Sequence, residues 1–211
     1  MFTDRASAGR TLASHLSAYS RGDAVVVLGL PRGGVVVAAE VATVLRAPLD
    51  VCVVRKLGVP GREELAFGAV AAGGALVLNG EVVNAFRLTD EDIQGVVRRE
   101  RLELDRRERA YRGESAPPVA VAGSTAILVD DGLATGATMR AAVEAMRAAE
   151  PALIVVAVPV AAAATCAMIQ QLADAVVCAE MPSSFSAVGQ WYLDFRQTTD
   201  DEVRELLAFR R

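Results

Sequence analysis

The sequence predicts an α/β fold in which a mostly parallel sheet is flanked by helices. Short apolar segments alternate with helical patterns along the chain, which is typical of a parallel sheet with crossover helices. The chain has 211 residues, of which 53% are hydrophobic and only 5% aromatic. It can therefore bury one sizeable core rich in valine, alanine and leucine. No internal repeat is visible, so we expect a single domain over residues 1–211.

The individual elements follow from local patterns, taken in chain order. An amphipathic helix comes first, over residues 7–19. Apolar runs bounded by turn residues predict the strands, at 24–30, 49–54, 68–72, 75–78, 124–129, 153–158 and 175–178. Helical patterns predict the remaining helices, over 35–46, 90–112, 137–149, 161–172 and 200–209. Segment 113–123, which contains two adjacent prolines, is the best candidate for a linker.

Composition excludes several classes of function. The net charge of −4 gives no general attraction to nucleic acid. The longest apolar stretch, 152–169, is interrupted by Pro159 and rich in alanine, which favours a core strand and helix over a membrane span. The N-terminus lacks the organisation of a secretion signal, so we expect a cytoplasmic protein. The cysteines have no metal-ligand spacing and are expected to be reduced core residues, namely Cys52, Cys166 and Cys178.

The most informative segment is 126–139, where an apolar strand runs into two acids and then a loop rich in glycine and threonine. Gly132 and Gly136 let the backbone approach a ligand, and amides at the start of the following helix can bind an anion. Asp130 and Asp131 would lie about one sugar ring away, where they can accept hydrogen bonds from vicinal hydroxyls. The pattern indicates a site for a phosphorylated sugar. The structural alternative is an ordinary strand-to-helix turn capped by Asp131.

At these residues the chain resembles the type I phosphoribosyltransferases, whose motif is an apolar strand, two acids and a loop of the form x-x-x-Thr-Gly-x-Thr. The resemblance implies the fold of that family with a small hood, and 5-phosphoribosyl 1-pyrophosphate (PRPP) as substrate. It implies that Asp130 and Asp131 contact the ribose hydroxyls. It assigns the 5-phosphate to a loop of seven residues, Gly132, Leu133, Ala134, Thr135, Gly136, Ala137 and Thr138.

One position departs from a branch of that family. Ala134 stands where the hypoxanthine-guanine enzymes carry an aspartate near the base, which argues against that specificity. An alanine there is similar to the adenine-using branch, and also to members of unassigned substrate. Adenine, another purine, a pyrimidine and a non-nucleobase amine all remain open as acceptors.

A second glycine-rich loop ends the first predicted strand, with the sequence Gly29-Leu30-Pro31-Arg32-Gly33-Gly34. Carboxyl ends of parallel strands meet at one edge, so this loop faces the first. The Arg32 guanidinium can bind two oxygens of a phosphate at once. In the resembled family the corresponding loop binds pyrophosphate, often with a cis peptide, a role we carry over to Arg32, Gly33 and Gly34 while leaving the peptide geometry open. A purely structural turn is the alternative.

The second predicted strand ends in Arg55 and Lys56, ahead of a loop over 58–65 that contains Arg62. Lys56 is the only lysine beside 21 arginines, so its place at a strand end favours a specific role over generic surface charge. We expect Arg55 and Lys56 to neutralise pyrophosphate as it leaves, and the loop with Arg62 to close over the site. The alternative is that both are solvated charges flanking a strand.

Aromatic residues gather after the last predicted strand, where 181–195 holds four of the ten in the chain. Such rings can stack on a base, so we expect the hood to comprise 181–195 and helix 89–112, around a core of about 20–180, with Phe185, Trp191 and Tyr192 as base contacts. A core cluster or dimer interface is the alternative. Helix 89–112 carries seven arginines and four acids in 98–112, whose three- and four-residue spacing favours a salt-bridged, solvated face. His15 is expected to lie on a helix face far from the site.

Together these observations predict transfer of a phosphoribosyl group from PRPP to a nitrogen acceptor, with release of pyrophosphate. A nucleobase is the expected acceptor. Arg32, Arg55, Lys56, Asp130 and Asp131 would form the catalytic set. The resemblance implies Mg²⁺ held mainly by substrate oxygens, with Asp130 and Asp131 reached through water or substrate. It also implies a homodimer, whereas the expectation of no membrane or nucleic-acid partner comes from the composition and charge pattern above. Two alternatives remain: a non-catalytic sensor of PRPP or nucleotides, and a PRPP-forming kinase, for which no ATP site is visible.

Overall fold

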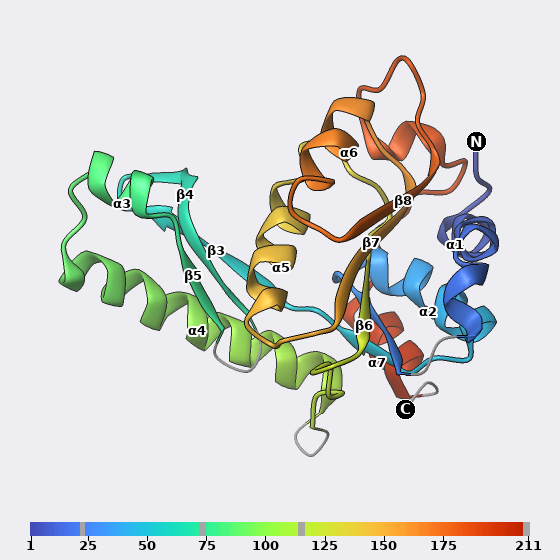
Figure 1. Ribbon diagram of the computed structural model, residues 1–211, viewed down its shortest axis with the longest axis horizontal. Helices are drawn as coiled ribbons and strands as arrows, with labels where there is room; N and C mark the ends of the chain where they lie inside the picture. Colours follow the sequence, from blue (N-terminus) through green and yellow to red (C-terminus); the bar gives the residue numbers. More distant parts are fainter. Residues whose placement is uncertain (22–23, 72–74, 114–116, 209–211) are drawn as a thin grey trace.

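The computed structural model describes residues 1–21, 24–71, 75–113 and 117–208. Its centre is a five-stranded sheet in the order β2-β1-β6-β7-β8, in which every neighbouring pair is parallel (Figure 1). The strands are β1 (Val25–Gly29), β2 (Leu49–Val51), β6 (Thr125–Val129), β7 (Leu153–Val160) and β8 (Ala175–Glu180). The expected α/β architecture with a parallel sheet is thus confirmed.

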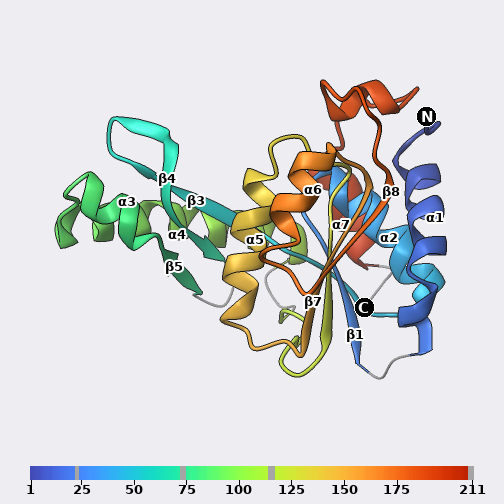
Figure 2. The ribbon, with the colours of Figure 1, turned by 45° about the horizontal axis from the view of Figure 1, so that its top comes forward.

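Helices cover both faces of this sheet. Helices α1 (Arg5–His15), α2 (Gly33–Leu45) and α7 (Asp200–Ala208) lie on one face, and α5 (Ala137–Arg147) and α6 (Ala163–Ile169) on the other (Figures 1 and 2). Successive residues of β1 point to opposite faces. Val25 and Val27 join the core under α2, while Val26 and Leu28 join the core under α5. Because both faces are covered, β1 is apolar along its whole length.

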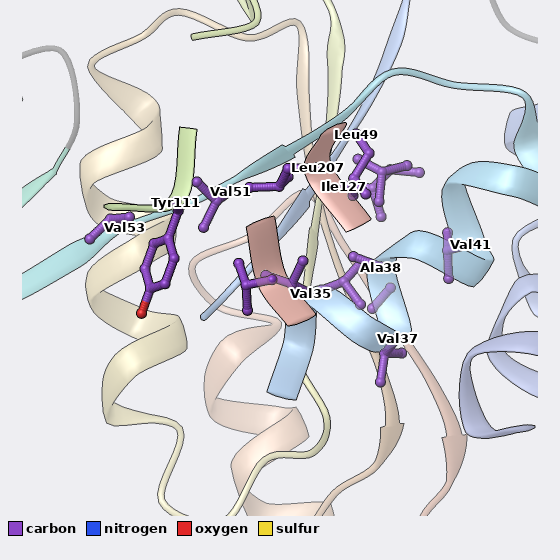
Figure 3. Packing of buried hydrophobic residues seen from close by; sticks show 14 of the residues in the cluster. Val35, Val37, Ala38, Val41, Leu49, Val51, Val53, Tyr111, Ile127 and Leu207 are labelled. Atoms are coloured by element: carbon purple, nitrogen blue, oxygen red, sulfur yellow. The ribbon is translucent and has the colours of Figure 1, made fainter. Parts of the chain in front are cut away.

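The larger core brings together residues from helices and strands that are distant in sequence. Figure 3 shows four residues of α2 packed beside side chains of β2, β6 and α7. Many of these side chains are aliphatic, as the composition predicts. The labelled members are Val35, Val37, Ala38, Val41, Leu49, Val51, Val53, Tyr111, Ile127 and Leu207.

A second unit projects from one side of the parallel sheet. We call it the antiparallel arm (residues 54–112): a sheet of β3 (Val54–Val59), β4 (Arg62–Ala71) and β5 (Leu76–Leu78), followed by α3 (Gly80–Ala85) and α4 (Asp90–Arg112) (Figure 2). It packs on the core through α5, which contacts β3 and β4, and through α4, which contacts α7.

The arm overturns two expectations. The strand expected over 49–54 is two strands, because β2 pairs with β1 only as far as Val51 and β3 begins in the other sheet at Val54. The expected irregular loop over 58–65 is a β-hairpin, whose turn at Pro60 and Gly61 is formed with a positive φ of 77° at Gly61. Gly61 tolerates this conformation at little steric cost. The short helix α3 was not expected.

The other predicted elements are present with shifted ends. Helix α4 has the expected bounds, and Thr89 and Asp92 cap it reciprocally. Helix α1 begins earlier because Asp4 caps it through the Ser7 amide, and a 3₁₀ helix (Ser17–Arg21) follows. A second 3₁₀ helix is Val188–Trp191. Three expectations fall partly outside the described residues: the strand end at Ala72, the linker at 114–116 and the helix end at Phe209.

Two further expectations concern cysteines and membrane spans. The three cysteines are free, with Cys52 and Cys166 buried and Cys178 half-buried. Within the described part of the chain, every helix is too short or too polar to cross a bilayer.

Candidate functional site

Two glycine-containing loops meet at the carboxyl edge of the parallel sheet. Strands β1 and β6 are neighbours, with Gly29 opposite Val129, so the loops that follow them start side by side. The main chain joins them directly, since the Leu30 amide donates to the Val129 carbonyl over 2.8 Å. The sheet topology therefore brings together the two segments that the sequence singled out.

Close packing between the loops depends on Gly33 and Gly34. A Cβ added at Gly34 would lie 2.7 Å from the Val129 carbonyl oxygen and 2.8 Å from Cα of Asp130. A Cβ at Gly33 would overlap a carboxylate oxygen of Asp131 and lie 2.6 Å from Nε of Arg5. These positions need the absence of a side chain, because carbon atoms do not approach oxygen or nitrogen so closely without displacement.

The acidic pair is held by residues far away in sequence. Nε of Arg5, at the start of α1, donates to Oδ2 of Asp131 over 2.8 Å, and both side chains are largely buried. The Arg5 guanidinium also lies 4.0 Å from the ring centre of Phe195. The Tyr192 hydroxyl donates to the Asp131 carbonyl over 2.5 Å. Asp131 is therefore held both through its carboxylate, by Arg5, and through its main chain, by Tyr192.

The two carboxylates have different surroundings. Burial, then the adjacent charge of Asp131, raises the pKa of Asp130 well above its ordinary value. Burial also raises the pKa of Asp131, but the hydrogen bond and charge of Arg5 oppose that shift. The Arg5 guanidinium therefore favours the charged form of Asp131, whereas the neighbouring negative charge disfavours the charged form of Asp130.

A small cavity of about 170 Å³ lies between the acidic pair and the start of α5. Gly136 starts α5 with a φ of 72°, and the first amides of a helix have no partner within it. Thr165 anchors the loop from outside, because its hydroxyl donates to the Ala134 carbonyl over 2.6 Å. The lining residues are Asp130, Gly132, Leu133, Ala134, Thr135, Gly136, Ala137, Thr138, Met139 and Val188. The cavity thus combines a carboxylate with the start of a helix, where amides without a partner in the helix suit an anion.

Comparison with known proteins shows the family to which this chain belongs. The family model described as the phosphoribosyl transferase domain matches residues 3–196. The chain belongs to the phosphoribosyl transferase family. The match covers both loops, the acidic pair and most of the segment after β8.

Relatives of known sequence and structure agree with this assignment. Two curated proteins from Mycobacterium tuberculosis, of strains CDC 1551 and H37Rv, each share 52% identity with 96% of this chain, and both carry the provisional name phosphoribosyl transferase. The chain spans about half the length of these relatives, 45% of each. The crystal structure of TT1426 from Thermus thermophilus is 42% identical with a TM-score of 0.87, and the match covers 100% of this chain and 99% of that one.

In this phosphoribosyl transferase domain, Arg32 lies at the cap of α2, and the peptide joining Pro31 to Arg32 is cis. The geometry that the sequence left open is therefore settled. The guanidinium is half-exposed, with Nη1 of Arg32 lying 3.7 Å from a carboxylate oxygen of Asp200 on α7. Sequence analysis did not identify Asp200 as part of this region.

Arg55 and Lys56 lie on β3 of the antiparallel arm and point to opposite sides of it. Arg55 donates from two nitrogens to one oxygen of Glu100, over 2.9 and 2.7 Å, and Glu100 is a buried residue of α4. Lys56 is exposed and makes no hydrogen bond or ion pair with the described residues. Arg62 begins β4 and lies 5.5 Å from the Phe86 ring centre. The two predicted cations thus differ: Arg55 has a structural partner, and Lys56 has none among the described residues.

The aromatic residues expected to contact a base form a packed cluster instead. The Tyr192 ring is buried between Phe2 and Phe195, with ring centres 5.6 and 5.0 Å away, which leaves it no open face for stacking. Phe185 and Trp191 are partly buried against the same cluster. The structure thus places Tyr192 in a core cluster, the alternative that the sequence left open, and its role as a base contact stays a prediction. The contact with Phe2, from the N-terminal segment, could not be read from local sequence.

The two segments assigned to a hood lie apart. Helix α4 belongs to the antiparallel arm, whereas 181–195 packs beside the start of α1, at the other side of the molecule (Figures 1 and 2). His15 lies at the end of α1 opposite Arg5, as expected. Arg5 itself was missed, because a lone arginine in an N-terminal helix gives no local indication of a partner 126 residues away.

Proposed function

We propose that this domain transfers a phosphoribosyl group from PRPP to a nitrogen acceptor and releases pyrophosphate. The acceptor that we propose is a nucleobase. The observation that supports the proposal most strongly is the convergence of two loops on one acidic pair. A Cβ at Gly33 would overlap the Asp131 carboxylate, so the 31–34 loop and the acidic pair lie in direct contact at one edge of the sheet. A ligand bound there would carry an anion at each end and hydroxyls between them.

In the proposed reaction, the bond between ribose C1 and the pyrophosphate oxygen breaks, and a bond from C1 to the acceptor nitrogen forms. The 5-phosphate occupies the cavity before α5, and Asp130 and Asp131 accept hydrogen bonds from the ribose hydroxyls. Positive charge develops on the ribose ring and negative charge on the leaving group. The protein's contribution is positioning and electrostatic stabilisation, for which Arg32 and Lys56 supply cationic groups.

Arg55 has a different part in this scheme. Its guanidinium already binds Glu100, so in the proposal it holds β3 against α4 and presents Lys56 on the opposite side of the strand. Because 30% of its side chain is exposed, we keep Arg55 in the pyrophosphate-binding set and in the catalytic set. The other proposed catalytic residues are Arg32, Lys56, Asp130 and Asp131.

Magnesium fits this site as a substrate-bound ion. The described residues contain no group of three or more potential metal ligands, so an ion here would take most of its ligands from PRPP and water, as Mg²⁺ commonly does. Asp130 and Asp131 supply the hard oxygen atoms that could reach it through water. When bound, the ion would neutralise pyrophosphate charge.

The decisive experiment measures pyrophosphate release from PRPP and magnesium across purine, pyrimidine and pyridine bases. We expect release with one base or a small set, and its loss in the Asp130→Asn/Asp131→Asn variant. Asp90→Asn/Glu91→Gln, at the exposed start of α4, is the control with the same charge change. PRPP binding without release for any base would favour the sensor instead. Unchanged calorimetric affinity for PRPP in the acidic-pair variant would refute the site.

The proposal retains the homodimer that the resemblance implied and the cytoplasmic location expected from the N-terminal sequence. Sedimentation of the purified chain would test the dimer, and cell fractionation the compartment. Neither property is needed for the assignment of the acidic pair.

A further inference from the structure

A polar cleft of about 460 Å³ lies beside the 31–34 loop, on the side of α4 and α7. Pro31 and Arg32 form one wall, and the carboxyl-terminal half of α4 forms the opposite wall. Asp200, at the start of α7, lies at the third side. The complete lining is Pro31, Arg32, Arg106, Arg107, Ala110, Tyr111 and Asp200.

Helix α4 presents two arginines to this cleft. Arg106 and Arg107 lie one turn before Ala110 and Tyr111, and residues three and four apart share a helix face. Glu103 orients both guanidiniums, because Nε of Arg106 and Nε of Arg107 donate to its carboxylate over 2.7 and 2.8 Å. The small side chain of Ala110 leaves space between them and Arg32.

Tyr111 fixes the position of this helix face. Its ring is buried in the core beside Val51, and its hydroxyl points away from Val51 and Val53 (Figure 3). That hydroxyl donates to a carboxylate oxygen of Asp200 over 3.2 Å. The cleft is therefore bounded by a helix that is anchored in the core, although the guanidinium groups of Arg106 and Arg107 reach solvent.

The charges around the cleft favour an anion. Three guanidiniums line it, against the carboxylate of Asp200 in the lining and that of Glu103, which pairs with both Arg106 and Arg107, so the balance of these groups is one positive charge. The pair between Arg32 and Asp200 has a separation of 3.7 Å and half-exposed partners. Exposed ion pairs of this kind contribute little, so a phosphate oxygen can replace Asp200 as the partner of Arg32. Guanidiniums suit phosphate because they donate two parallel hydrogen bonds.

We propose that this cleft is a phosphoanion subsite in which Arg106 and Arg107 bind the pyrophosphate end of PRPP together with Arg32. The inference rests on the proposed function and assigns it two residues outside the glycine loops. It gives a role to part of the arginine-rich half of α4, which the sequence pattern alone assigned to a solvated face. It also links the two units, because Arg32 belongs to the parallel core and Arg106 and Arg107 to the arm.

The test is calorimetric titration of the full chain with magnesium pyrophosphate and, separately, with ribose 5-phosphate, at near-physiological salt. In Arg106→Gln/Arg107→Gln we expect pyrophosphate affinity to fall at least about tenfold, the loss of one charge-assisted hydrogen bond, with PRPP affinity falling in parallel. Ribose 5-phosphate affinity should not change. The matched control is Arg98→Gln/Arg109→Gln, which removes the same charge from exposed positions of α4 outside the cleft.

The outcomes separate this inference from the proposed function. Undiminished pyrophosphate affinity in the cleft variant, with ribose 5-phosphate still bound, would overturn the subsite alone. An equal loss in the control variant would also overturn it, since general charge would then explain the effect. Weakened pyrophosphate with unchanged PRPP affinity would show a phosphate site separate from the leaving group, against the inference. A parent chain that binds neither ribose 5-phosphate nor PRPP would refute the proposed function as well.

Discussion

The parallel core and the antiparallel arm place functional residues in different ways. All five residues of β1 are buried, and its loop is packed against the loop after β6 by close backbone contacts. In the arm, β4 begins with four exposed residues, and Lys56 on the neighbouring strand is exposed. The core therefore holds its loops in fixed positions, whereas the arm presents side chains that solvent can reach.

This difference matches the two tasks that the proposed reaction requires. Ribose and its 5-phosphate need a site formed in advance, since binding energy is lost when loops must be ordered first. The leaving group gains charge during the reaction and benefits from cations that approach as the site closes. The comparison predicts that changes in the core loops affect binding most, and changes in the arm affect turnover.

The largest effect is expected for Gly33→Ala. The new Cβ would displace the Asp131 carboxylate and Arg5, and a misplacement near 1 Å can cost about 100-fold in binding or rate. Both displaced groups are side-chain ends, so the fold should persist. Calorimetry with PRPP measures the loss. Gly95→Ala is the control, because an added Cβ there meets nothing within 4 Å, and removing a glycine from a helix should stabilise the protein by about 0.5–1 kcal/mol. PRPP affinity equal to the parent's in Gly33→Ala would contradict the tight packing of the loops.

That prediction depends on Arg5, a residue whose contact with Asp131 could not be predicted from the sequence. Strand β6, the acidic pair and the two loops could be predicted because each is a local pattern, and parallel strands place their carboxyl ends at one edge. The hydrogen bond from Arg5 to Asp131 could not, because it joins residues 126 positions apart. The covered ring of Tyr192 depends on Phe2 for the same reason.

The arm illustrates a second limit. The pattern of Gly, Pro and charged residues over 58–65 suits a loop as well as a hairpin with solvent on one side, and only the pairing of β3 with β4 distinguishes them. No local pattern pairs Arg55 with Glu100. That contact gives Arg55 a structural role that Lys56 lacks, although their adjacency had suggested identical roles.

Lys56→Ala should sharpen the contrast between the two units. We expect kcat to fall about tenfold, equal to ~1.4 kcal/mol of transition-state stabilisation, with a smaller loss in PRPP affinity because the leaving-group charge grows during the reaction. Comparing single-turnover rates with calorimetric affinity separates the two quantities. Lys56→Arg should recover most of the rate, since charge is the property required. Equal losses in rate and affinity would assign Lys56 to ground-state binding.

The smallest effect is a gain of stability in Asp130→Asn. Burial and the charge of Asp131 raise the pKa of Asp130 in the folded protein above its ordinary value of 3.8. The folded state then binds the proton more tightly than the unfolded state, so this carboxyl lowers stability as pH rises from about 3.8 through its folded-state pKa. Asn removes that cost while keeping the shape.

The expected gain for Asp130→Asn is about 0.5–2 kcal/mol at pH 8, the range typical of single stabilising substitutions, and it should shrink toward zero near pH 3.5. Urea denaturation at several pH values measures it. Asp105→Asn, on the exposed face of α4, should show no comparable gain at either pH. A gain that does not depend on pH would mean that packing, and not the buried charge, limits stability at the acidic pair. A pH-dependent gain accompanied by lost PRPP binding would show that the core retains this carboxylate for the ligand at a cost in stability.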